Sequence, residues 1–68
     1  MNIAKALEKT RVDQLKQLCN GPIWDGNLIS KDDRDFLFHE RYVDRVEGWN
    51  ILTMEGVKLA LQIRLLKT

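Results

Sequence analysis

The 68-residue sequence has a single cysteine, a single proline and no apolar run longer than three residues. A membrane-spanning helix needs about 20 apolar residues, so no segment is expected to cross a bilayer. Cys19 has no partner for an internal disulfide, which is typical of a reducing compartment. Residues 1–5 lack the apolar stretch of a signal peptide. We therefore expect a cytoplasmic protein.

The residue types that catalysis and metal binding require are also scarce. A zinc site needs three or four Cys or His ligands, and the sequence holds only Cys19 and His39. Ser30 and His39 would lie about 13 Å apart along a helix, too far for a nucleophile and its base. The glycines are too scattered for a phosphate-binding loop. We therefore expect a non-enzymatic protein with no catalytic residue, no metal and no cofactor.

What is present is the composition of one small globular domain. Apolar residues make up 44% of the chain and charged residues 31%, with a net charge of +1. A chain this short cannot divide into two cores. We therefore expect a single domain over residues 1–68.

The first segment has the apolar spacing of an amphipathic helix. This spacing predicts one helix over about residues 2–19. The sequence Asn20-Gly21-Pro22 then ends it, because Pro22 cannot continue a helix. Arg11 projects close to the centre of the apolar stripe. The alternative is therefore a short N-terminal turn or helix, followed by a firmer helix over residues 11–19.

The next segment combines turn chemistry with a short apolar pair. Asp25-Gly26-Asn27 predicts a turn, since Gly and Asn tolerate positive φ. Trp24 is expected to plug the core beneath this turn. Leu28-Ile29 has the length of a small strand only.

Two further helices begin at residues with a hydroxyl group. Ser30 precedes a helix that ends near Arg41, and Thr53 precedes the final helix. Acidic side chains follow each cap, where the helix dipole favours negative charge. Between these helices, residues 42–46 and 49–52 predict two short strands. The order is helix, short strand, helix, hairpin, helix, which is an α+β domain with three helices.

The hairpin has two candidate registers. A three-residue loop with Gly48 left-handed pairs Val43 with Ile51 and Arg45 with Trp49, and this is the register we expect. A two-residue loop is the alternative, although it requires a positive φ at Glu47.

The final helix is apolar on two sides. Its first side carries Met54, Val57, Leu61 and Leu65, which we expect to pack on the hairpin and on the preceding helix. The predicted core is therefore Leu37, Val43, Ile51, Leu52, Val57 and Leu61. The second side carries Leu59, Ile63 and Leu66. It packs either on the N-terminal helix, through Leu7, Leu15 and Leu18, or on a second copy of the chain as an isologous homodimer.

The stretch over residues 41–56 resembles the end of a winged-helix domain. Arg45-Val46-Glu47-Gly48 is similar to the Arg-x-x-Gly wing, and Leu52-Thr53-Met54-Glu55-Gly56 to the Leu-Thr-x-x-Gly start of the closing helix. The same layout recurs in small proteins of phages and prophages, which suggests that origin. The resemblance covers about residues 28–61.

This resemblance implies a recognition helix over residues 31–41 and a wing over residues 43–52. A full winged helix places a positioning helix directly before the recognition helix. About ten residues separate Cys19 from Ser30, with Pro22 among them, so no such helix fits. The expected fold is therefore a reduced winged helix, or one in which the first helix has taken the positioning role.

Two uses of such a module are open, and both are regulatory. In the first, Lys31, Arg34, Arg41 and Arg45 contact DNA. However, residues 31–41 hold three basic and four acidic side chains, while phosphate neutralisation supplies much of the affinity for DNA. In the second use, which we slightly favour, the module docks on a protein, including its own copy. Trp49 is then either a partner-facing anchor or a lid over the core with Arg45 stacked on it.

Overall fold

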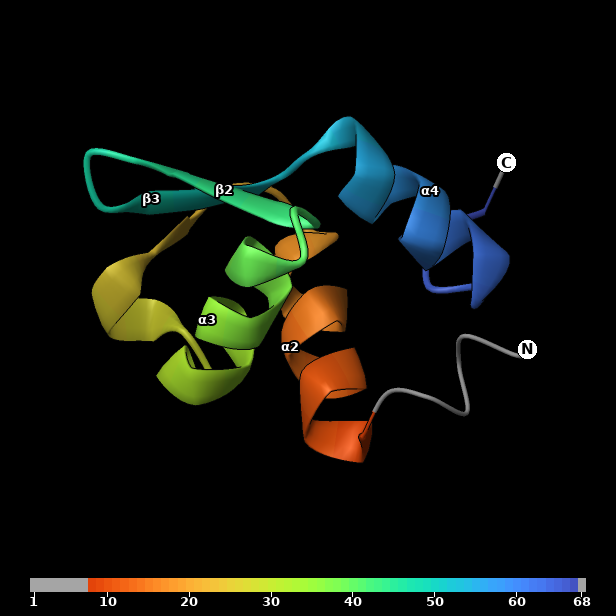
Figure 1. Ribbon diagram of the computed structural model, residues 1–68, viewed down its shortest axis with the longest axis horizontal. Coiled ribbons are helices and arrows are strands. Elements are labelled where there is room, and N and C mark those ends of the chain that lie inside the picture. The colour runs from red at the N-terminus through yellow and green to blue at the C-terminus, as the bar shows by residue number, and fades with distance from the viewer. Residues whose placement is uncertain (1–7, 68) are drawn as a thin grey trace.

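The computed structural model describes residues 8–67 and has three helices and a three-stranded antiparallel sheet in that range. The elements, in chain order, are α2 (Lys9–Leu18), β1 (Ile23–Trp24), the 3₁₀ turn η1 (Asp25–Asn27), α3 (Lys31–His39), β2 (Val43–Val46), β3 (Trp49–Leu52) and α4 (Met54–Gln62). Figure 1 shows α2 and α3 packed side by side beneath the sheet, with α4 at the end opposite the hairpin turn. The predicted α+β class and element order are confirmed, and the arrangement is compatible with the winged-helix resemblance.

The two predicted hydroxyl caps are confirmed. The Ser30 hydroxyl accepts a hydrogen bond from the Asp33 amide at 3.2 Å, and the Thr53 hydroxyl accepts one from the Gly56 amide at 3.0 Å. Each bond satisfies an amide that has no partner within its own helix. The helix α3 ends at His39, two residues before the predicted end.

The first described helix is shorter than predicted. Glu8 has an extended backbone (φ −68°, ψ 153°), and α2 begins at Lys9. The prediction of one continuous helix through this position is therefore wrong. The alternative, with a firmer helix over residues 11–19, agrees better with the observed bounds of α2. The part of the prediction over residues 1–7, including Leu7, lies outside the described residues.

Two glutamines of α2 hold the connection that precedes α3. The Gln14 side chain is fully buried, and its Oε1 accepts a hydrogen bond from the Ser30 amide at 2.8 Å. The Gln17 side chain accepts from the Ile29 amide at 3.1 Å and donates to the Asn27 carbonyl at 2.7 Å. These bonds fasten an irregular segment, where a full winged helix would carry a positioning helix.

The sheet has the strand order β1-β3-β2, and its hairpin has the register that we did not expect. Val46 pairs with Trp49, so the loop contains two residues only. Glu47 (φ 50°) and Gly48 (φ 86°) both take the left-handed conformation of a primed turn. The three-residue loop, with Arg45 opposite Trp49, is therefore wrong. The twist of a primed turn matches the twist of the strands, and Glu47 adopts the required positive φ.

The short strand β1 comes earlier than predicted. Ile23 pairs with Asn50 and Trp24 with Trp49, and the Asp25 amide then donates to the Gly48 carbonyl at 2.9 Å. The predicted strand Leu28-Ile29 lies outside the sheet, because η1 turns the chain away before it.

The core forms where α2, α3, β2 and α4 meet. Its buried apolar residues are Leu15, Leu18, Leu37, Val43, Leu59 and Ala60. Of the predicted core, Leu37 and Val43 are confirmed, and Leu52 packs against it while partly exposed. Ile51, Val57 and Leu61 are only half-buried.

The rotation of α4 explains the difference in the core. A Cβ atom at Gly56 would collide with the Tyr42 carbonyl oxygen, so glycine lets the helix backbone approach the start of β2. The face that carries Gly56, Leu59 and Ala60 therefore points inward. Leu59 is 2% exposed, whereas Met54 on the predicted inner side is 69% exposed.

Within residues 8–67, none of the helices has the length and apolar character that crossing a membrane requires.

The orientation of α4 predicts that two leucine-to-alanine substitutions in this helix lower the free energy of unfolding by different amounts. Leu59→Ala should lower the free energy of unfolding by about 2–5 kcal/mol, because it leaves a cavity in the core. Leu61→Ala, on the same helix but half-buried, should cost clearly less. Urea unfolding followed by circular dichroism measures both, and a larger loss for Leu61→Ala would contradict this orientation of the helix.

Candidate functional site

One carboxylate joins three elements at the hairpin end of the molecule. Asp25 in η1 accepts hydrogen bonds from Arg34 in α3 at 3.1 Å and from Asn50 in β3 at 2.8 Å. Arg45 in β2 donates to both oxygens of the same carboxylate. Its Nε lies 3.1 Å from Oδ1 and 3.0 Å from Oδ2, and its Nη2 makes a closer contact with Oδ2. We call these four residues the Asp25 cluster.

Asn50 completes the cluster from inside the fold. Its side chain is fully buried, and its amide nitrogen donates both to Asp25 and to the Ile23 carbonyl at 3.0 Å. Its amide oxygen accepts from Arg34 at 2.9 Å. Every hydrogen of the amide nitrogen therefore has a partner, as a buried polar group requires.

The cluster changes the acid–base behaviour of its members. The hydrogen bonds from Arg45, and after them the one from Asn50, hold the pKa of Asp25 well below its usual range. The same contact raises the pKa of Arg45. Both groups stay ionised at neutral pH, and the charges of the two arginines are directed at a carboxylate of the protein.

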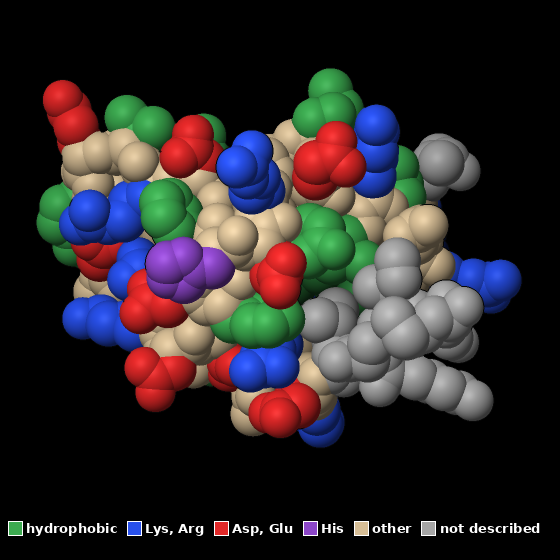
Figure 2. Space-filling model, viewed as in Figure 1, with side chains coloured by type: hydrophobic (Ala, Val, Ile, Leu, Met, Phe, Trp, Pro, Cys, Tyr) green, Lys and Arg blue, Asp and Glu red, His purple; other side chains and the backbone are tan. Residues whose placement is uncertain are grey.

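The four predicted DNA-contacting side chains fall into two pairs. Arg34, with a side chain only 13% exposed, is held by Asp25 and Asp35, and Arg45 is held by Asp25. Lys31 and Arg41 are exposed and form no ion pair within residues 8–67. On the face in Figure 2, side chains of both charge signs are interspersed. The predicted contacts therefore do not form one cationic surface.

A row of exposed apolar side chains crosses the sheet beside this cluster. Val46, Trp49 and Trp24 lie directly opposite one another on β2, β3 and β1, and residues so paired point to the same face. Their exposed fractions are 53%, 47% and 46%. We call these three residues the tryptophan row.

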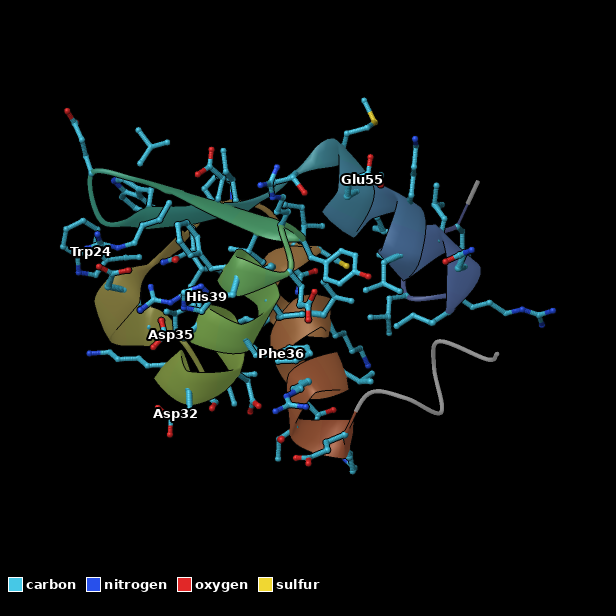
Figure 3. All side chains as sticks on the ribbon, viewed as in Figure 1. Trp24, Asp32, Asp35, Phe36, His39 and Glu55 are labelled. Atoms are coloured by element: carbon cyan, nitrogen blue, oxygen red, sulfur yellow. The ribbon has the colours of Figure 1, made fainter. Side chains whose placement is uncertain are left out.

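The two indoles of the row support each other. Their centroids lie 5.4 Å apart with an interplanar angle of 64°, an edge-to-face contact. Gly48 makes room for this arrangement, since a Cβ atom there would meet the Trp24 ring at 2.5 Å. Figure 3 shows Trp24 at the hairpin end of the molecule, away from α4.

Neither tryptophan has the purely structural role that the sequence analysis considered for it. Trp24 is not a core plug, because its ring lies against the hairpin turn and half of it is exposed. Trp49 does not carry Arg45, whose guanidinium is bound to Asp25 instead. The candidate anchor Trp49 thus gains a partner in Trp24, which sequence reasoning missed. The pairing of Trp24 with Trp49 depends on β1, and a two-residue strand leaves little signal in the sequence.

The predicted dimer contacts on α4 are only partly accessible. Leu59 lies in the core and cannot contact a second copy, which corrects its assignment. Ile63 packs against the core, and Leu66 is half-buried.

The side chains considered for nucleophilic or acid–base chemistry are those of Ser30, Cys19 and His39. The Ser30 hydroxyl caps α3, and burial raises the pKa of the half-buried Cys19 thiol. His39 contacts Phe38 edge to face and lines an open hollow of about 440 Å³ together with Arg41. In the described part of the chain, no group of three or more His, Cys, Asp or Glu residues is placed to hold a metal ion.

No family model, curated protein or solved structure matches the chain. The geometry of the described residues therefore carries the functional argument.

The Asp25 cluster predicts how the fold responds to acid. Since the pKa of Asp25 is lower in the folded protein than in the unfolded chain, its stabilisation is complete above the unfolded value, near 4. That stabilisation is lost as the pH falls toward the folded value. Thermal melts between pH 7 and pH 2 should therefore show a steeper loss of stability for the wild type than for Asp25→Asn.

A matched variant separates this effect from general acid denaturation. Glu40→Gln removes an exposed carboxyl group outside the cluster and should keep the steep wild-type profile. Parallel profiles for the wild type and Asp25→Asn would show that the cluster contributes no pH-dependent stability.

Proposed function

We propose that the chain is a winged-helix-like, non-catalytic regulatory module that docks on another protein through the tryptophan row. The observation that carries this proposal is the row itself. Two adjacent tryptophans, each about half exposed, are unusual on a surface that binds no partner. Aromatic side chains, Trp above all, are the commonest anchors of protein interfaces.

The rigidity of the row supports the same proposal. The register of three paired strands positions the side chains, and the Asp25 cluster fastens the same strands from the opposite face. A surface held in this way loses little conformational entropy when a partner binds. It therefore suits recognition better than two flexible side chains on a loop would.

The state of the arginines favours a protein over DNA. In a DNA-binding winged helix, Arg34 and Arg45 would neutralise phosphates from the recognition helix and the wing. Here their guanidinium groups neutralise Asp25. Of the four predicted DNA contacts, only Lys31 and Arg41 are exposed and outside the ion pairs of residues 8–67. Two cations give a weak electrostatic contribution, because affinity for DNA grows with the number of phosphates neutralised.

Site-specific photocrosslinking tests the proposal. A benzoylphenylalanine side chain at position 46 lies inside the row, and one at position 29 serves as the control, since Ile29 is 62% exposed outside it. In the cells that make the protein, position 46 should crosslink to a defined protein, and Trp49→Ala should abolish the adduct. Position 29 should not yield that adduct.

The alternative, a DNA-binding regulator, predicts a different result. A fluorescein-labelled duplex should bind no tighter than micromolar at physiological salt, with little preference among sequences. Nanomolar binding to one operator that is lost in Arg34→Ala, or equal protein adducts from positions 46 and 29, would overturn the proposal.

A further inference from the structure

We infer that the tryptophan row binds a short segment of another protein in which Lys or Arg stands beside an aliphatic side chain. This inference rests on the proposed function and specifies the chemistry of the partner. It follows from the charge that borders the row, from the geometry of the two indoles, and from the size of the apolar surface.

The charge that borders the row is negative. Asp44 lies two residues before Val46 on β2 and so shares its face of the sheet, and Glu47 stands in the adjoining turn. Both side chains are exposed, and neither enters any of the ion pairs found within residues 8–67. The nearest cation along the chain, Arg45, points to the opposite face and is bound by Asp25. Asp44 also lines the open hollow that Arg41 and His39 line, whereas Glu47 stands in the turn. The row is therefore bordered by two exposed carboxylates that form no ion pair within residues 8–67.

The geometry of the indoles suits a cation as well as an alkyl group. In an edge-to-face pair, the face of one ring meets the edge of the other, and about half of each indole stays exposed. The face of an indole is the most favourable aromatic site for an ammonium or guanidinium group. The methylene stem of Lys or Arg meanwhile packs on the same apolar surface. One basic side chain can thus pack on the indole rings and also pair with the carboxylates beside them.

The size of the row favours a short segment over a second copy of the chain. A fully exposed indole offers about 250 Å², so two half-exposed indoles and Val46 leave roughly 300 Å² of apolar surface. Each partner in a stable protein complex contributes about 800 Å². In an isologous dimer, moreover, the same patch meets itself. Asp44 and Glu47 of one copy would face those of the other, and such like-charge contacts oppose binding.

A nucleic acid is disfavoured by the same carboxylates. Indole rings can stack on unpaired bases, but single-strand binding surfaces combine this stacking with cationic side chains that follow the phosphates. Here the groups that flank the rings are anionic. Binding of a single strand is therefore an outcome that would overturn the inference.

The first test needs no ligand, because Trp24 and Trp49 are the only tryptophans of the chain and both lie in the row. Caesium and iodide quench indole fluorescence, and a negative local potential concentrates the cation. Relative to free N-acetyltryptophanamide, caesium should quench the protein more strongly and iodide more weakly. The caesium-to-iodide ratio should fall about twofold or more in Asp44→Asn/Glu47→Gln. The variant Asp32→Asn/Glu40→Gln removes the same charge from the first turn and the C-cap of α3 and should keep the wild-type ratio.

The second test uses two synthetic hexapeptides, one alternating Leu with Arg and the other alternating Leu with Glu. The basic peptide should shift the tryptophan emission and bind at least tenfold more tightly than the acidic one, and Asp44→Asn/Glu47→Gln should remove the difference. Equal binding of both peptides, no binding of either at millimolar concentration, or preferential binding of oligo(dT) would overturn the inference.

The docking surface and the chemistry of its partner can be tested separately. If position 46 crosslinks to a protein in a Trp49-dependent way but the peptides bind equally, the row is a docking surface and its partner is not cationic. If position 46 yields no such adduct, the proposed function itself fails.

Discussion

The arrangement of the hairpin end depends on the hydrogen bonds that the Asp25 carboxylate accepts. This carboxylate accepts them from α3, from β2 and from β3, and it stands in the turn that connects β1 to α3. Asn50 extends the same network to the β1 backbone. In a domain with a small apolar core, such a network supplies the specificity of packing that a few leucines cannot. The relative placement of the sheet and α3 follows from it.

The same interaction determines which surfaces are available for binding. Because Arg34 and Arg45 are bound to Asp25, two of the four cations expected on the recognition helix and the wing of the resembled fold are engaged within the protein, while Lys31 and Arg41 stay exposed. On the other face of the same strands, the tryptophan row remains exposed with Asp44 and Glu47 beside it. An arrangement compatible with a winged-helix-like fold thus presents an apolar surface bordered by carboxylates. This contrast is why the site, and not the fold, decides the function.

The element order and the helix caps could be predicted because they depend on local chemistry. Ser30 and Thr53 bond to amides three residues away, so their role can be inferred from neighbouring residues alone. The features that were missed depend on contacts between distant segments. The rotation of α4 follows from the approach of Gly56 to Tyr42, and the exposure of Trp24 follows from its pairing with Trp49. The cluster itself was hidden because Asp25 is equally typical of a turn. Its one sequence signal was Asn50, a polar residue at an inward-facing strand position.

A double-mutant cycle between Asp25 and Arg34, measured by urea unfolding, tests the central claim most directly, because it isolates the energy of one pair. If Arg34 belongs to the fold, Asp25→Asn and Arg34→Gln will each destabilise the protein. The double variant will then lose much less stability than the two single losses together. Strictly additive losses would contradict the account. They would mean that the arginine does not depend on Asp25 and is available to an external anion.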